Sequence, residues 1–333
     1  MYLHFIGAGG IGMSGLAAAF RDLGCKITGS DRGADRPENS HIIQPLKNIG
    51  IEIFPQDGSY INCGTPDYLV YSSAIEEDNP DFIAGKNIKR LHRSEVLAKL
   101  IEQNSASQFS VAVTGSCGKS TVTAYLAEAL LNLNADPRCL NGAVSKRFMS
   151  DKCVGNYRSG NGKFFVFEAD ESDKSLLNYS ADYAVILNIG TDHYSKEELA
   201  EVFGKFLQQT RRGAVIERGV YEMVKEFIPK HLNIKIFESE LTSEAEYAVS
   251  SYHLDKSTNI PRPLASFAGS DKIFCLPQCG LHMAKNAVAI IALLEMAGFD
   301  REKAEQAICR FDGIKRRTDF AGYNVSGFSV YDD

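Results

Sequence analysis

The sequence lacks the features that point to nucleic acid, a membrane or export. It has no basic excess: 36 Lys and Arg stand against 42 Asp and Glu, a net charge of −6, which excludes general nucleic-acid affinity. Its longest apolar stretch, residues 287–297, is broken by Glu295 and is shorter than the roughly 20 residues that span a bilayer. The apolar segment 2–6 has no basic flank or cleavage site, so we expect no signal peptide. We expect a cytoplasmic monomer or weak homodimer without nucleic-acid or membrane partners.

The sequence also lacks paired cysteines of the kind that hold zinc. Its eight cysteines are scattered, and only Cys275 and Cys279 lie close together. A structural zinc site needs a second such pair or nearby histidines. We therefore predict free thiols in a reducing compartment.

What the sequence does contain is an alternation of apolar strands and helical segments. Its 333 residues, 44% of them apolar, suit about two globular domains. The alternation predicts an α/β protein with an N-terminal Rossmann-like parallel-sheet domain and a central α/β domain of the P-loop ATPase type. The polar segment 103–108 predicts domains at 1–106 and 107–317, followed by a linker at 318–333. Besides the elements described below, we predict helices at 92–101, 198–209, 284–296 and 301–309.

The stretch from Val111 to Thr121 predicts a phosphate-binding loop. An apolar strand ends at a short glycine loop, Gly115-Ser116-Cys117-Gly118-Lys119-Ser120-Thr121, and a helical pattern follows to about Leu133. In such loops backbone N–H groups and the helix N-terminus face the phosphates, the lysine adds a positive charge and the serine hydroxyl binds Mg²⁺. Val113 stands where the general motif has its first glycine, so this is a short form.

A second glycine loop lies near the N-terminus. Gly7-Ala8-Gly9-Gly10-Ile11-Gly12 falls between the strand at 2–6 and a helix predicted at 13–23. Asp31 ends the next strand, where NAD-binding proteins keep a ribose-binding acid. The pattern therefore fits a dinucleotide. It also fits a nucleotide-sugar diphosphate, because the loop recognises phosphates and not nicotinamide.

Polar side chains follow three apolar runs of the central domain. The runs are 111–114, 164–168 and 183–189, and each resembles a strand buried on both faces of a parallel sheet. Ligands gather beyond the carboxyl ends of such strands. We therefore expect four groups to converge at one edge: Lys119, Glu168, Asp170 and His193.

Together these motifs resemble the Mur ligases, the ATP-dependent amide ligases of peptidoglycan assembly. The resembling segments follow the family's order along the chain: 4–16, 72–75, 115–121, 168–173, 188–193, 280–286 and 311–317. Within the family, the start at His4 and the run Glu168-Ala-Asp-Glu-Ser-Asp173 point to members that bind UDP-N-acetylmuramate.

The resemblance implies a reaction and a set of site residues. ATP and Mg²⁺ would convert the lactoyl carboxylate of UDP-N-acetylmuramate to an acyl phosphate, which the amine of L-alanine attacks. The implied catalytic residues are Lys119, Glu168 and His193, and the implied Mg²⁺ ligands are Ser120, Glu168 and His193. The implied ATP site comprises Gly115, Ser116, Cys117, Gly118, Lys119, Ser120, Thr121, His282, Asn286 and Arg316. The implied UDP-sugar site comprises Gly9, Gly10, Ile11, Gly12, Asp31, Ser72 and Ser73.

The sequence departs from the family pattern at several places, among them the third-strand signature at 188–193. Cys117 stands where the loop usually carries His, and Met283 where an Asn usually contacts adenine. The chain stops at 331–333, where the family's third, amino-acid-binding domain begins, so we expect nucleotide binding without completed ligation.

Three alternatives stay open at this point. One is the related ligase that attaches a tripeptide to UDP-N-acetylmuramate. Another is an NAD(P)-dependent oxidoreductase, which leaves Lys119, Glu168 and His193 unexplained. The last is a non-catalytic nucleotide-binding protein.

Overall fold

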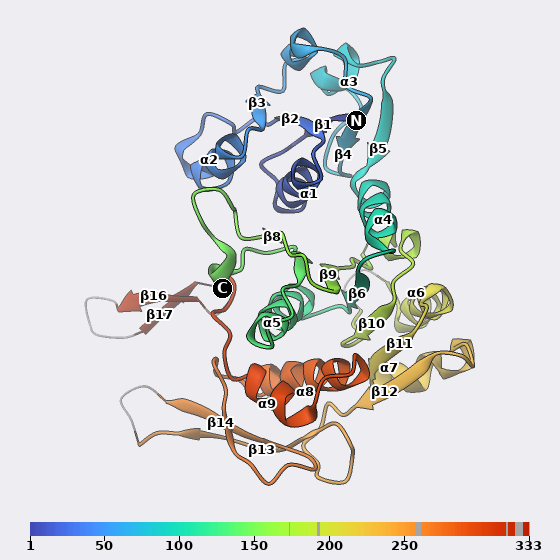
Figure 1. Cartoon of the computed structure of the whole chain (residues 1–333), viewed down its shortest axis with the longest axis vertical. Coiled ribbons are helices and arrows are strands. Elements are labelled where there is room, and N and C mark those ends of the chain that lie inside the picture. Colours follow the sequence, from blue (N-terminus) through green and yellow to red (C-terminus); the bar gives the residue numbers. More distant parts are fainter. Residues whose placement is uncertain (173, 192–193, 258–260, 318, 324–328, 333) are drawn as a thin grey trace. The chain divides into compact units, whose positions relative to one another are not determined.

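The computed structural model describes residues 1–172, 174–191, 194–257, 261–317, 319–323 and 329–332 (Figure 1). Contacts within the chain define two compact units. The first unit comprises Met1–Gln103, Cys139–Gly160 and Ile314–Asp333, and the second comprises Asn104–Arg138 and Asn161–Gly313. Each unit is thus built from segments that are separated in the sequence. The domain boundaries predicted from the sequence, at residues 106 and 317, remain a prediction.

The first unit contains a five-stranded parallel sheet in the order β3-β2-β1-β4-β5. Its strands are β1 (Tyr2–Ile6), β2 (Lys26–Ser30), β3 (Glu52–Phe54), β4 (Tyr68–Tyr71) and β5 (Lys89–His92). Its helices are α1 (Ile11–Asp22), α2 (Ser40–Asn48), α3 (Pro80–Ala84) and α4 (Arg93–Asn104, at the boundary between the units). The strand order reverses between β1 and β4, and open parallel sheets generally bind ligands at such a reversal, beyond the carboxyl ends of the strands. The predicted Rossmann-like sheet is confirmed.

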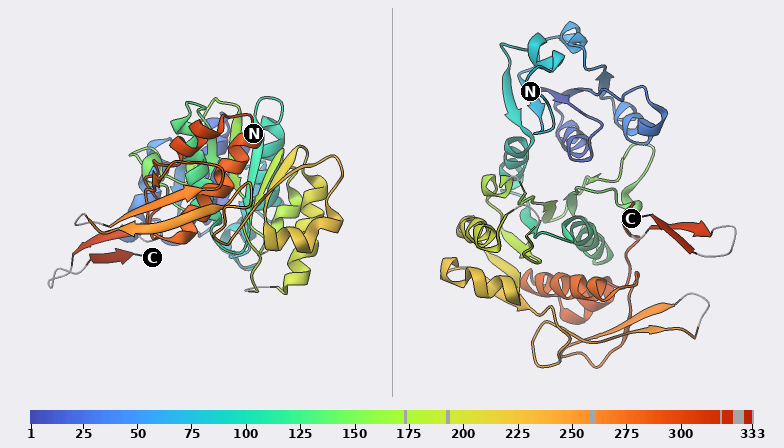
Figure 2. Two further views of the ribbon diagram at one scale, coloured as in Figure 1. Left: turned by 90° about the horizontal axis from the view of Figure 1, so that it is seen from below. Right: turned by 180° about the vertical axis from the view of Figure 1, so that it is seen from behind.

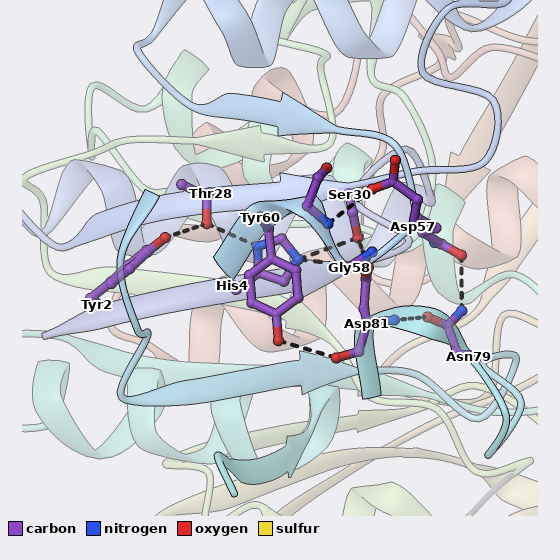
Figure 3. A network of polar contacts seen from close by, with 11 residues as sticks. Tyr2, His4, Thr28, Ser30, Asp57, Gly58, Tyr60, Asn79 and Asp81 are labelled. Carbon is purple, nitrogen blue, oxygen red and sulfur yellow. Dashed lines mark hydrogen bonds and ion pairs between the residues drawn. The ribbon is translucent and has the colours of Figure 1, made fainter. Parts of the chain in front are cut away.

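Strand β1 contributes a buried polar network to the core of the first unit (Figure 3). The His4 ring is fully buried, stacks on Tyr60 with the centroids 3.9 Å apart, and places Nδ1 2.9 Å from Thr28 Oγ1. Its Nε2 lies 3.3 Å from Ser30 Oγ, which donates to Asp81. Burial lowers the pKa of His4, while Asp81 acts in the opposite direction. The imidazole is therefore neutral at pH 7.

The network reaches the loops at the edge of the sheet. Asp81 Oδ1 accepts from the Gly58 N–H at 2.9 Å, and the Asp81 carbonyl accepts from the Tyr60 hydroxyl at 3.1 Å. Burial, reinforced by Asp81, raises the pKa of Tyr60 to about 12. The Ser30 carbonyl accepts from the N–H groups of Gly7 and Ala8, at 2.8 and 2.9 Å. The network thereby fixes the strand that holds the N-terminal glycine loop.

The second unit contains five parallel strands in the order β12-β11-β10-β6-β9. These are β6 (Phe109–Thr114), β9 (Phe164–Glu168), β10 (Tyr183–Ile186), β11 (Gly213–Glu217) and β12 (Asn233–Phe237). Figures 1 and 2 show α5 (Lys119–Asn132) and α8 (Leu281–Met296) on one face and α6 (Lys196–Gln209) and α7 (Arg218–Val224) on the other. Helix α9 (Arg301–Ala307) packs against α8. The three apolar runs predicted to carry polar ends are thus adjacent strands, β10-β6-β9.

Further strands make antiparallel pairings. They form the pairs β7 (Arg138–Leu140) with β8 (Tyr157–Arg158) and β16 (Asp319–Tyr323) with β17 (Ser329–Asp332), and the sheet β13 (Val249–Asp255), β14 (Arg262–Phe267) and β15 (Phe274–Cys275). In Figures 1 and 2, β13 and β14 form a long hairpin near α8. All eight cysteines are free, as predicted. Among the described helices, none has the length and apolar character needed to cross a bilayer.

Candidate functional site

The loop after β6 has the geometry that its glycines require. Gly115 and Gly118 have φ of 132° and 87°, a region that side-chain-bearing residues rarely adopt. An added Cβ at Gly115 would lie 3.1 Å from the Asn188 backbone nitrogen, so the loop passes close to the chain after β10. Gly118 precedes Lys119, the first residue of α5. Strand, loop and helix N-terminus therefore follow one another as the sequence predicts.

Lys119 is held by carboxylates from the segment after β9. Its Nζ lies 2.8 and 3.1 Å from the two carboxylate oxygens of Glu171 and 3.8 Å from Asp170 Oδ1. The Glu171 side chain is 5% exposed and the Lys119 side chain 15%. The predicted convergence of Lys119 and Asp170 is confirmed, and the nearest partner is a residue that we did not single out. Glu171 stands in the same acidic run, but the run itself does not show which carboxylate turns toward the lysine.

Glu168 occupies the end of β9. It is paired in register with Val113 of β6, two positions before Gly115, and is half-buried. Ser120 lies in the first turn of α5, after the loop that leaves β6. Adjacent parallel strands therefore direct these two predicted Mg²⁺ ligands to the same edge of the sheet.

A pocket of about 440 Å³ lies beside the loop in the second unit. Its apolar wall includes Leu187, Ile189, Met223 and Phe237. Gly219 of α7 also lines it, and its polar side chains come from the chain after β10, from α6 and α8 and from the ends of β11 and β12: Asn188, Lys196, Glu217, Ser239, His282, Lys285 and Asn286. An added Cβ at Gly118 would lie 3.8 Å from Asn286 Oδ1, which places the pocket next to the loop.

The pocket has a volume within the range of small-molecule sites, and its lining combines apolar side chains with polar groups that can fix the orientation of a ligand. His282 and Asn286, the residues predicted to contact adenosine, both line it. Met283 is 3% exposed, is buried on the other side of α8 and is not among the lining residues. Lys196, Glu217 and Lys285 were not predicted, because only the packing of separate elements brings them together.

The N-terminal glycine loop is held by the end of β2. The Gly9 N–H donates to Asp31 Oδ2 at 2.8 Å, and the Gly33 N–H donates to Asp31 Oδ1 at 2.8 Å. Asp31 therefore supports the loop, whereas the sequence motif suggested a contact with ribose. Ser72 and Ser73 follow β4 on the other side, and an added Cβ at Gly7 would lie 3.3 Å from Ile75 Cδ1. The predicted residues of this site thus follow β1, β2 and β4 of one parallel sheet, with Gly10, Ile11 and Gly12 leading into α1.

Two predicted residues are not placed at the ATP loop by the structure. His193 lies outside the described residues. Arg316 is exposed, has a left-handed φ of 57° and belongs to the first unit. Among the other loop residues, Cys117 is exposed, and Ser116 and Thr121 are half-buried.

The described residues include no ready-made cluster of three or more His, Cys, Asp or Glu side chains that would hold a metal on their own. Mg²⁺ does not require one, since it usually binds through one or two protein oxygens together with phosphates and waters. The Ser120 hydroxyl and the Glu168 carboxylate are oxygen donors of this kind, so the donor set fits Mg²⁺.

Comparison with known proteins gives matches along most of the chain. The pattern described as "Mur ligase family, catalytic domain" matches residues 2–105, and the "Mur ligase middle domain" matches residues 113–294. A UDP-N-acetylmuramate–L-alanine ligase of Agrobacterium fabrum is 32% identical over 99% of the chain and 69% of the relative. One of Coxiella burnetii is 31% identical over 96% and 67%, respectively.

Solved structures show the same fold. The UDP-N-acetylmuramate-alanine ligase MurC of Thermotoga maritima superposes with a TM-score of 0.82 and 26% identity, covering 100% of this chain and 74% of that one. A murein peptide ligase of Psychrobacter arcticus gives 0.75 at 23% identity, covering 100% and 72%, a likeness of fold alone.

Proposed function

Because the chain belongs to the Mur ligase family, we propose that it is an ATP-dependent ligase that joins L-alanine to UDP-N-acetylmuramate in peptidoglycan precursor synthesis. Identity of 31–32% to ligases of that name over nearly the whole chain favours L-alanine over a tripeptide. The proposal places the reaction in the cytoplasm and requires Mg²⁺.

The loop and the adjoining pocket of the second unit support the ATP site. Gly115–Thr121 would bind the triphosphate through backbone N–H groups, the α5 N-terminus and Lys119. The pocket beside it would hold the adenosine against His282 and Asn286. The observation that carries this assignment is the pocket's position next to a Lys119-bearing loop, since a chance glycine turn has no reason to adjoin a nucleoside-sized pocket.

The N-terminal loop supports the nucleotide-sugar site. Gly9, Gly10, Ile11 and Gly12 would face the diphosphate at the start of α1, with Ser72 and Ser73 after the neighbouring strand β4. Asp31 would act mainly by holding the Gly9 amide in place. This function needs no nicotinamide, in accordance with the family.

The proposed chemistry is two transfers at one carboxylate. A carboxylate oxygen of the substrate attacks the γ-phosphorus of ATP, ADP leaves, and an acyl phosphate forms. The amine of L-alanine then attacks the acyl carbon, loses a proton, and expels inorganic phosphate as the amide forms. Enzymes promote such phosphoryl transfer mainly by positioning and charge neutralisation. Lys119 would neutralise charge on the phosphates, and Ser120 and Glu168, with His193 as a further candidate, would hold Mg²⁺, which supplies additional charge neutralisation when bound.

Two titrations test this function. Isothermal calorimetry of the full chain should detect binding of UDP-N-acetylmuramate and of Mg-ATP, and none of NADH. Lys119→Ala should weaken Mg-ATP binding by about 100-fold, the loss of one or two charge-assisted contacts. The same variant should leave UDP-N-acetylmuramate binding unchanged, because that site lies in the first unit.

Binding of NADH in place of UDP-N-acetylmuramate would contradict the assignment. Unaltered Mg-ATP binding by Lys119→Ala would remove the loop from the ATP site.

A further inference from the structure

Asn188 makes a two-point contact with the phosphate loop. The Cys117 N–H donates to Asn188 Oδ1 at 2.8 Å, and Asn188 Nδ2 donates to the Cys117 carbonyl at 2.9 Å. The carboxamide therefore satisfies both backbone polar groups of one loop residue. Only Asn and Gln side chains offer a donor and an acceptor in this arrangement.

Two further hydrogen bonds join the same two segments. The Ser116 N–H donates to the Asn188 carbonyl at 3.4 Å, and the Gly190 N–H donates to Ser116 Oγ at 2.7 Å. Residues 116–117 and 188–190 are thus tied by both backbone and side-chain contacts. The segment 188–190 follows β10, the strand beside β6, so the tie crosses between the ends of two neighbouring strands.

Asn188 also lines the nucleoside pocket, together with His282 and Asn286. One side chain therefore borders both parts of the proposed ATP site. The loop has two glycines with positive φ and an exposed Cys117, so its tip depends on these contacts with residues 188–190 to stay in one conformation. Loss of the Asn188 contact would leave the loop to be ordered by the nucleotide itself, which lowers affinity.

We propose that Asn188 is a positioning residue of the ATP site, which pins the phosphate loop at a fixed distance from the nucleoside pocket before ATP arrives. The inference rests on the proposed ATP site and adds to it a residue that acts through the loop backbone. It predicts that an unpinned loop binds Mg-ATP more weakly although Lys119 and Ser120 are unchanged.

The test compares Asn188→Ala with Asn132→Ala in the full chain. Asn132 is a matched control because its carboxamide also donates to two backbone carbonyls of the second unit, those of Ala307 and Arg310 at 2.8 and 3.0 Å. It ends α5, about 20 Å along the helix from Lys119. Asn188→Ala should weaken Mg-ATP binding by about tenfold, and Asn132→Ala by less than about twofold.

Amide hydrogen exchange adds a readout that a general loss of stability would not give. In Asn188→Ala, exchange at Cys117 should accelerate by about tenfold while exchange in β6 and β10 stays as in the wild type. Asn188→Asp, nearly identical in shape, should be at least as defective. Its carboxylate can accept from the Cys117 N–H but faces the Cys117 carbonyl without a proton to donate.

The outcomes separate this inference from the proposed function. Mg-ATP binding by Asn188→Ala and Asn188→Asp within about twofold of the wild type would overturn the positioning role and leave the ATP site standing. Faster exchange throughout the second unit would also overturn it, since Asn188 would then act on stability alone. Absence of Mg-ATP binding in the wild type would reject both.

Discussion

At the scale of single residues, the Lys119–Glu171 pair is the most informative contact of the second unit. The ammonium contacts both oxygens of a carboxylate that is almost fully buried. Such a carboxylate is costly to leave without a partner. The ion pair therefore holds the Lys119 side chain beside the phosphate loop. ATP must compete with Glu171 for the ammonium group.

Removal of the charge at Lys119 should destabilise the protein through Glu171. We expect Lys119→Met to lower the free energy of unfolding by about 1–3 kcal/mol, the cost of an unpaired buried polar or charged group. Adding Glu171→Gln should restore most of that loss, since the amide needs no counter-charge. Urea unfolding followed by circular dichroism measures both, with the exposed Lys205→Met as control. Additive effects in the double variant would show that the pair is not coupled.

His4 illustrates what the sequence could not show. Within the motif it was only the first residue of a family signature, yet the structure buries it completely against Tyr60, Thr28 and Ser30. Burial lowers its pKa, so the unfolded chain takes up a proton near pH 6.5 that the folded chain does not. Stability from this residue is therefore present above that pH and is lost as the pH falls toward the lowered pKa.

The pH dependence of stability should report this burial. Between pH 7.5 and 5.5 the wild type should lose up to about 1.4 kcal/mol per pH unit below pH 6.5 through His4 alone. His4→Gln keeps a polar side chain without this titration and should show a shallower decline in urea unfolding. His41→Gln, an exposed histidine of α2, should decline as the wild type does. Parallel curves for the wild type and His4→Gln would contradict the assignment.

At the scale of elements, the N-terminal glycine loop depends on a close approach to β2. An added Cβ at Gly29 would lie 2.5 Å from the Ala8 Cβ and 3.1 Å from Ile53 Cδ1. A glycine in β2 thus lets the loop lie directly against the strand, with Gly7 and Ala8 bonded to the Ser30 carbonyl. The position of the N-terminal glycine loop therefore depends directly on the packing of β2.

Gly29→Ala should displace this loop. We expect a loss of about 1–3 kcal/mol in the free energy of unfolding, typical of overpacking, and weaker binding of UDP-N-acetylmuramate. Gly29→Ala combined with Ala8→Gly should recover part of the stability and part of the binding, because the second change removes the Ala8 methyl group that the new Cβ would contact. Urea unfolding measures the stability of the two variants, and isothermal calorimetry measures their UDP-N-acetylmuramate binding, with Mg-ATP binding as the internal control. A double variant no better than Gly29→Ala would place the strain elsewhere.

Elements with strong apolar periodicity could be predicted from the sequence. The strands around both glycine loops, the helices that follow them, and the adjacency of the strands ending near Lys119, Glu168 and Asn188 all agree with the structure. The short strands β7 and β8 and the long hairpin β13–β14 carry no such pattern, since their residues are only partly apolar. The roles of Glu171 and Asn188 were also missed, because each depends on which way one side chain turns in a polar segment.

At the scale of the whole molecule, the account rests on two phosphate-binding loops, one in each compact unit. The N-terminal loop follows β1 of the first unit, and the Lys119 loop follows β6 of the second. Each loop precedes a helix and stands at the end of a parallel strand, and the second adjoins the pocket that we propose for the nucleoside. We propose that the first loop binds the nucleotide sugar and the second binds ATP.

Separate sites should give separate stabilisation. A ligand at 100 times its Kd stabilises the folded chain by about 2.7 kcal/mol, and two ligands at independent sites should add. We expect the melting temperature to rise with UDP-N-acetylmuramate, to rise with Mg-ATP, and to rise further with both. Lys119→Ala, with binding weakened about 100-fold, should reduce only the Mg-ATP contribution, from about 2.7 to about 0.4 kcal/mol. If both ligands together raised the melting temperature no further than one of them alone, the two would share one site.

The most direct measurement is a crystal structure of the chain with UDP-N-acetylmuramate and the magnesium complex of a non-hydrolysable ATP analogue. The account predicts the triphosphate against Lys119 and the backbone of Gly115–Ser120, the adenine between His282 and Asn286, and the sugar diphosphate at Gly9–Gly12. Density for the triphosphate away from Lys119, or for the uridine nucleotide in the pocket of the second unit, would contradict it.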